Sequence, residues 1–229
     1  MTKIRKISLA AVSVLLSALL ILSGFMIYND LSDWQKEKED FAELVELVQI
    51  KPQLPAETLS PTDDEPEPAR RRDLAPLFAQ NSDCIGWLCI PDTEVDYPVM
   101  HTPENPQKYL RRNFDCEYSQ SGVPFLDYRC SPDSGDLLIY GHNMKNGTMF
   151  SDLKKYLDAD FLSSHQTIEL QIANSLYCYT VTEIRVTDTS DKWYEDIGKN
   201  LFENKRFLVL STCYGGGNGR LLIIAAKDN

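Results

Sequence analysis

The chain has 229 residues, of which 43% are hydrophobic, 25% charged and 10% aromatic. This is the composition of an ordinary folded protein, neither disordered nor collagen-like. The formal net charge of −11 argues against nucleic acid as a partner, because such a partner calls for a basic face. Six cysteines without a C-x-x-C pair and only three histidines argue against a dense disulfide scaffold and against a metal site. We therefore expect neither a metal nor a cofactor.

The N-terminal segment predicts a membrane anchor. Residues 7–28 read ISLAAVSVLLSALLILSGFMIY, without a charged side chain, and about 20 such residues cross a bilayer as a helix. Lys3, Arg5 and Lys6 precede the span, and positive charge marks the cytoplasmic side. We expect a single-pass protein in the cell membrane, with a cytoplasmic N-terminus and an extracellular domain. A cleaved signal peptide is the alternative, although this apolar run is longer than a usual signal core.

The next segment predicts a stalk and a linker. Apolar residues recur at spacings of three, four and seven, as on one face of an amphipathic helix: Leu31, Trp34, Phe41, Val45 and Val48. Residues 51–72 then contain five prolines and an acidic run, which cannot continue a helix and suit an extended linker. Three parts are expected: a cytoplasmic tip and transmembrane anchor (1–29), a stalk helix and linker (30–72), and a folded domain (73–229).

From Asp73 onward, short apolar runs alternate with turn residues, which predicts a mainly β domain. Eight runs read as strands: 85–90, 95–100, 123–127, 136–141, 167–172, 176–186, 207–213 and 220–226. Short helices are expected between some of them: 73–81, 106–114, 149–157 and 191–202. Because helices do not regularly separate the strands, a closed or nearly closed β-barrel fits better than a parallel α/β fold.

Residues suited to nucleophilic catalysis lie at three strand ends. The apolar run FLVLSTC ends at Cys213, and the glycine-rich turn after it can return the chain as an antiparallel strand. Arg220 opens that strand, across the hairpin from Cys213, while DLLIYGHN carries another strand out to His142. An imidazole can take the proton of a thiol, and a guanidinium can bind the oxyanion that forms on a carbonyl. Each residue alone has an ordinary structural interpretation, and the sequence does not show whether the strand ends adjoin.

The remaining cysteines and histidines are interpreted as structural. The cysteines fall at core or strand positions: Cys84, Cys89, Cys116, Cys130 and Cys178. Five cannot all pair within one chain if Cys213 stays free. His101 follows a strand and His165 lies in the polar stretch SSHQT, so we expect both to be structural or exposed.

The order of these motifs resembles the sortase family, and class B sortases most of all. The resemblance lies in GWLCIPDTEVDYPVM, GVPFLD, YGHNM and LSTC with a following arginine, and extends over residues 73–226. Sortases are membrane-anchored cysteine transpeptidases of mainly Gram-positive bacteria. The resemblance implies an eight-stranded sortase-type β-barrel with short peripheral helices, preceded by an N-terminal transmembrane helix, and a reaction without a cofactor.

By this resemblance, Cys213 is the nucleophile, His142 its acid/base partner and Arg220 the group that holds the oxyanion or the substrate. Ser211 and Thr212 are expected to contact the substrate. The implied partners are secreted surface proteins that carry a C-terminal sorting motif. The enzyme cleaves the motif through a thioester and transfers the protein to an amine on a peptidoglycan precursor or another acceptor.

Two features depart from the class B pattern. About twenty residues separate Val186 from the strand that begins at residue 207, where class B members usually insert a long helix. Gly215 stands where some members carry an acidic residue. Two other functions stay open: a cell-wall cysteine peptidase or amidase that uses water as the acceptor, and a non-catalytic barrel that binds envelope components. His142 precedes Cys213, the reverse of the order in papain-like peptidases, which counts against the first.

Overall fold

The computed structural model describes residues 3–48, 71–133, 135–192, 194, 197 and 206–228. The chain divides into two compact units, Met1–Ala42 and Glu43–Asn229. The linker expected at residues 51–72 lies almost entirely outside the described residues. The three-part division of the chain therefore stays a prediction.

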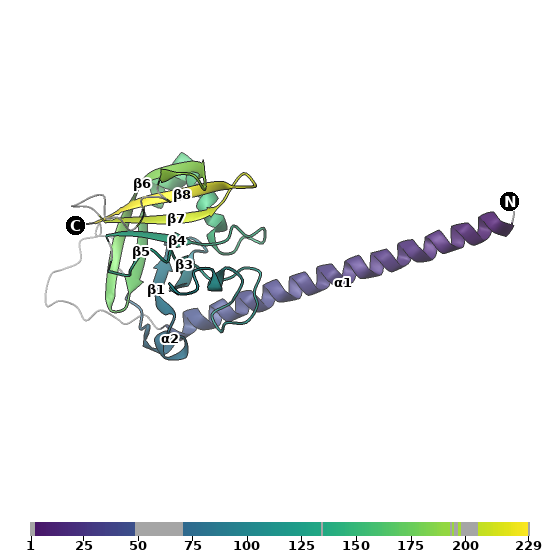
Figure 1. Ribbon diagram of the computed structural model, residues 1–229, viewed down its shortest axis with the longest axis horizontal. Helices are drawn as coiled ribbons and strands as arrows, with labels where there is room; N and C mark the ends of the chain where they lie inside the picture. Colours follow the sequence, from purple (N-terminus) through teal and green to yellow (C-terminus); the bar gives the residue numbers. More distant parts are fainter. Residues whose placement is uncertain are drawn as a thin grey trace. The chain divides into compact units, whose positions relative to one another are not determined.

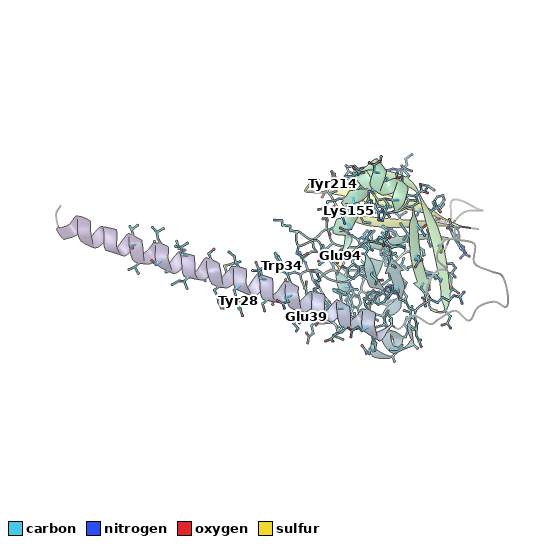
Figure 2. The ribbon with its side chains drawn as sticks, turned by 180° about the vertical axis from the view of Figure 1, so that it is seen from behind. Tyr28, Trp34, Glu39, Glu94, Lys155 and Tyr214 are labelled. Carbon is cyan, nitrogen blue, oxygen red and sulfur yellow. The ribbon has the colours of Figure 1, made fainter. Side chains whose placement is uncertain are left out.

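Helix α1 is long and apolar enough to cross a membrane. It runs unbroken from Lys3 to Leu47, so the expected anchor and stalk form one continuous helix. Large apolar side chains in its first half are exposed, and Leu20 and Ile21 are each 74% exposed; Figure 2 shows such side chains along the helix, with Tyr28 labelled. Exposed apolar side chains over this length suit a helix surrounded by lipid. A signal sequence near an N-terminus has the same length and apolarity.

The second unit contains a closed β-barrel, and the described residues supply eight strands to it (Figure 1). The strands are β1 (Cys84–Cys89), β2 (Asp96–Met100), β3 (Phe125–Leu126), β4 (Asp136–Tyr140), β5 (Thr167–Ile172), β6 (Ser175–Asp188), β7 (Phe207–Cys213) and β8 (Gly219–Lys227). Their order around the barrel is β1-β2-β3-β4-β7-β8-β6-β5. The predicted fold class is confirmed, and each predicted strand has a counterpart with similar bounds.

Strands β7 and β8 contribute a large share of the buried residues of the barrel. Their apolar runs are buried along nearly their whole length, unlike strands that have one face in water and alternate polar with apolar residues. The 3₁₀ helix η2 (Phe150–Leu157) packs against both strands and contributes the fully buried Phe150 and Leu153. The burial of β7 ends at its last residue, Cys213, which is exposed.

Two strand pairings bring the three predicted strand ends together. β7 and β8 pair antiparallel, with Cys213 opposite Arg220. β4 and β7 pair parallel, with Tyr140 opposite Ser211, so both strands end at the same edge of the barrel. The residue after β4 continues the pairing, because the amide of Gly141 donates to the Ser211 carbonyl at 3.1 Å.

The helices differ more from the sequence-based expectation than the strands do. The helix expected at 106–114 is reduced to a 3₁₀ turn, η1 (Lys108–Leu110), because backbone groups of Arg111 and Asn113 bond to residues 117–119 instead of continuing a helix. The region 149–157 is 3₁₀ (η2) rather than α-helical, and α2 (Ala75–Gln80) agrees with the expectation.

One short helix had no counterpart in the sequence-based expectation. Helix α3 (Ala159–Ser164) begins after Asp158, whose carboxylate accepts hydrogen bonds from the amides of Asp160 and Phe161, the pairing typical of a helix N-cap. The helix expected at 191–202 lies mostly outside the described residues.

Candidate active site

A pocket with a volume of about 490 Å³ opens at the ends of β4, β7 and β8. All five candidate site residues line it: His142, Ser211, Thr212, Cys213 and Arg220. Within the described part of the chain, no cluster of three His, Cys, Asp or Glu side chains is arranged to hold a metal ion. Three of the five candidate residues bring a thiol, an imidazole and a guanidinium to one pocket.

Cys213 differs from the other cysteines in its exposure. All six lie in the described part of the chain and are free thiols, and Cys213 is the exposed one. Burial raises the pKa of the Cys84 thiol to about 12 and that of Cys130 to about 11. Such thiols stay protonated at neutral pH, and a protonated thiol is a poor nucleophile. The structure thus distinguishes one exposed thiol, Cys213, from cysteines that are buried or half-buried.

His142 follows the end of β4 and is oriented by the backbone of η1. Its Nε2 lies 2.9 Å from the carbonyl oxygen of Leu110. A carbonyl only accepts hydrogen bonds, so Nε2 carries the proton in the neutral ring and the lone pair is on Nδ1. Burial lowers the pKa of His142, the hydrogen bond to Leu110 opposes this shift, and the charge of Arg111 adds to it. The imidazole is consequently neutral near pH 7, the form that can accept a proton.

Arg220 presents its guanidinium at the pocket beside Cys213. One Nη1 hydrogen bond, 2.8 Å to the carbonyl of Gly219, holds the side chain. Among the described residues no carboxylate lies within ion-pair distance of it. A guanidinium has five N–H donors, so most of them are left for a ligand in the pocket.

Side-chain hydrogen bonds fasten the end of β4 to the end of β7. The hydroxyl of Thr212 donates to the carbonyl of Gly141 at 2.8 Å, and the amide of Asn143 donates to the carbonyl of Cys213 at 2.9 Å. Gly141 and Asn143 lie on either side of His142 in the sequence, and their partners are Thr212 and Cys213. Two hydrogen bonds therefore fix the position of the end of β4 relative to the end of β7. The role of Asn143 could not be foreseen, because its partner is 70 residues away.

Ser211 and Thr212 line the pocket but are almost fully buried, at 1% and 2% exposure. The hydroxyl of Ser211 lies 2.6 Å from that of Tyr194, and the Thr212 hydroxyl is bonded to Gly141. Both side chains already have partners within the protein. Their expected contact with substrate stays a prediction.

One further part of the pocket lining was not expected from the sequence. It contains Asp127, Arg129, Tyr140 and Tyr194. The signal that could have indicated it is weak: Asp127 and Arg129 are an acid and a base two residues apart, in the turn that follows β3. Burial raises the pKa of Asp127, but the stronger combined effect of hydrogen bonds from Arg129 and Tyr140 leaves it below its usual value.

Comparison with known proteins gives consistent results. A family model described as a sortase domain matches residues 88–228. Sortase B of Listeria monocytogenes is 42% identical over 126 residues, which cover 54% of this chain and 50% of that protein. The matched region thus spans about half the length of the Listeria relative. Sortase B of Staphylococcus aureus is 25% identical over 202 residues, which cover 87% of this chain and 78% of that protein.

Solved structures resemble the barrel. A crystal structure of sortase B from Bacillus anthracis has a TM-score of 0.66 and 25% identity, over 86% of this chain and 98% of that one. A substrate complex of Staphylococcus aureus sortase B has a TM-score of 0.59 and 24% identity, over 67% of this chain and 83% of that one. The second similarity is one of fold alone.

Proposed function

Because the chain belongs to the sortase family, we propose that it is a class B-type cysteine transpeptidase. Its substrates are secreted proteins with a C-terminal sorting motif, and its acceptor is an amine of the cell wall. The observation that carries the proposal is the convergence of Cys213, His142 and Arg220 on one pocket at adjoining strand ends.

The first step forms the nucleophile and the new bond. His142 accepts the proton of the Cys213 thiol on Nδ1, the ring nitrogen whose lone pair is free because Nε2 donates to Leu110. The sulfur then attacks the carbonyl carbon of the scissile peptide bond, and the carbonyl oxygen becomes an oxyanion. The lowered pKa of His142 keeps the ring in its basic form before the attack and makes the resulting imidazolium a good proton donor.

The second step releases the C-terminal fragment of the substrate. Arg220 donates hydrogen bonds to the oxyanion, with N–H groups that the protein leaves free. As the oxyanion collapses, the carbon–nitrogen bond breaks and the imidazolium of His142 gives its proton to the leaving amine. The acyl group remains on Cys213 as a thioester.

The third step transfers the acyl group. The acceptor amine attacks the thioester carbon and loses a proton to His142. The carbon–sulfur bond then breaks, and His142 returns the proton to the departing sulfur, which regenerates the Cys213 thiol. Each bond that forms is matched by one that breaks, so the reaction needs no external energy source. Water in place of the amine would give hydrolysis instead.

We propose that α1 anchors the enzyme, with the N-terminus in the cytoplasm and the barrel outside, where both substrates are found. The apolar span and the basic residues before it support this orientation. Protease added to intact protoplasts should remove the barrel or cut the preceding linker, as detected with a C-terminal epitope. Full protection of the epitope would contradict the proposed topology.

The reaction is tested with a panel of candidate sorting peptides and an amine acceptor, followed by mass spectrometry. We expect a thioester on Cys213, resolved by the amine, and no adduct in Cys213→Ala. His142→Ala should slow acylation by at least about a hundredfold. Cys178→Ala is the matched control, because this half-buried cysteine lies on β6 and does not line the pocket.

Three results would contradict the proposal in different ways. An adduct in Cys213→Ala would move the nucleophile elsewhere. Cleavage without any aminolysis would favour the peptidase or amidase alternative. Binding of envelope components without acylation by any peptide would favour a non-catalytic barrel.

A further inference from the structure

Tyr194 forms one wall of the pocket and is held there by three different contacts. Its hydroxyl lies 2.6 Å from the Ser211 hydroxyl, two residues before the thiol. Its ring stacks on that of Tyr140, with centroids 6.3 Å apart and ring planes 6° from parallel. Its backbone carbonyl accepts a hydrogen bond from Nη1 of Arg129. The third contact joins the chain after β6 to the chain after β3, and both residues line the pocket.

Arg129 is itself oriented by a buried carboxylate. Asp127 is 4% exposed, and its two oxygens accept from Nε and Nη2 of Arg129, both at 2.9 Å. The hydroxyl of Tyr140 donates to the same carboxylate at 2.7 Å. A bidentate pair fixes the plane of a guanidinium. With Nε and Nη2 occupied by Asp127, Nη1 is directed at the carbonyl of Tyr194.

The Asp127–Arg129 ion pair has no net charge with which to attract a substrate. The charge of Arg129 is balanced by Asp127, and three of its donor groups are bonded within the protein. Arg220, which also lines the pocket, has one such bond, to Gly219. This contrast assigns charge stabilisation to Arg220 and a mechanical role to Arg129.

We propose that Asp127 and Arg129 are positioning residues that hold Tyr194 at the pocket wall and thereby set the affinity for the peptide substrate. They act on the shape of the pocket and not on the chemistry at Cys213. The proposal rests on the proposed transpeptidase function.

The test replaces Arg129 by glutamine in the full chain. Gln cannot bond to Asp127 twice and also reach Tyr194, so we expect KM for a sorting peptide to rise about tenfold, the effect of losing one charge-assisted hydrogen bond. The value of kcat should stay within about twofold of wild type. Amide hydrogen exchange should be faster in peptic peptides that contain Tyr194 and unchanged in those from β7.

Two further variants make the test specific. Arg72→Gln is the matched control, because Arg72 also forms a bidentate pair, with Asp96 at 2.8 and 2.9 Å, and does not line the pocket. Arg129→Lys keeps the positive charge but cannot donate two parallel hydrogen bonds to Asp127, so its KM should lie between those of wild type and Arg129→Gln. Thermal unfolding of each variant fixes a temperature at which all are folded.

The outcomes separate this proposal from the one on which it rests. If Arg129→Gln changes neither KM nor exchange around Tyr194 beyond the Arg72→Gln control, the positioning role is wrong. A loss confined to kcat would also overturn it, since that result places Arg129 in the chemical step. Faster exchange around Tyr194, with no peptide processed by wild type, would support the holding contact and contradict the transpeptidase function.

Discussion

Gly141 separates β4 from His142, and replacing it by alanine should disturb both stability and catalysis. A Cβ at this position would lie 2.5 Å from Cγ of Phe150 and 2.6 and 2.8 Å from its Cδ atoms. Non-bonded carbon atoms prefer about 3.5–4.0 Å. Phe150 is fully buried, so its ring has no open space into which to turn, and either the ring or the end of β4 must move.

The size of the effect follows from this geometry. Adding a methyl group to a packed core costs about 1–3 kcal/mol, which lowers Tm by roughly 2–4 °C per kcal/mol in a chain of this size. If the backbone yields, the hydrogen bonds from the Gly141 amide to Ser211 and from Thr212 to the Gly141 carbonyl must lengthen. His142 then shifts with them, and a displacement of about 1 Å can cost about a hundredfold in rate.

The measurement is thermal unfolding together with the rate of Cys213 acylation by a sorting peptide. Phe150→Leu, which removes the ring, is combined with Gly141→Ala in a double-mutant cycle. We expect the double variant to be less destabilised than the sum of the two single ones, with a coupling of about 0.5–3 kcal/mol. Wild-type stability and rate in Gly141→Ala, or strict additivity in the cycle, would refute the reasoning.

Three further predictions concern the reactive groups. Arg220→Lys should stay folded yet acylate roughly a hundred- to a thousandfold more slowly, the usual loss when one oxyanion donor is removed; near-equal acylation rates at matched stability would transfer that role to backbone amides. Burial lowers the pKa of His142, and the positive charge of Arg111 lowers it further. As the pH decreases, kcat/KM should therefore stay constant through the pH range in which an ordinary histidine titrates, and fall only at lower pH. Arg111→Gln removes a positive charge and should move this acid limb to higher pH. Arg112→Gln should not, because Arg112 donates to the carbonyl of Cys116 and is not among the charges that act on His142; equal profiles for the two variants would show that Arg111 does not influence His142. Iodoacetamide should label Cys213 first among the cysteines, as peptide mass mapping would reveal, and preferential labelling elsewhere would contradict its assigned accessibility.

The sequence was most informative where contacts are local. Cys213 and Arg220 are joined by a short glycine-rich turn, so the hairpin that sets them opposite each other could be predicted from the turn alone, and the observed pairing confirms it. The apolar runs of β7 and β8 are recognisable because strands buried on both faces need continuous apolar residues. The eight-stranded barrel followed from counting such runs.

Contacts between distant segments could not be predicted in this way. The parallel pairing of β4 with β7 depends on which edges close the barrel, and apart from the family resemblance nothing near His142 indicates that β4 will lie beside β7. The contact from Arg129 to Tyr194 spans 65 residues. The overestimated helix at 106–114 has a related cause, because helix-compatible residues there bond to a following turn instead.

The pairing of β4 with β7 has a consequence for when the proposed site is assembled during folding. Strands β1 to β4 come from residues 84–140 and β5 to β8 from 167–227, and the two halves meet where β4 joins β7 and where β1 joins β5. Gly141 and Thr212, bonded across the first seam, are 71 residues apart, so closing it carries a loop entropy that the hairpins within each half do not. An incompletely closed barrel holds its thiol and its imidazole on separate halves. Under the proposed mechanism, Cys213 and His142 can therefore act together only after this seam has closed.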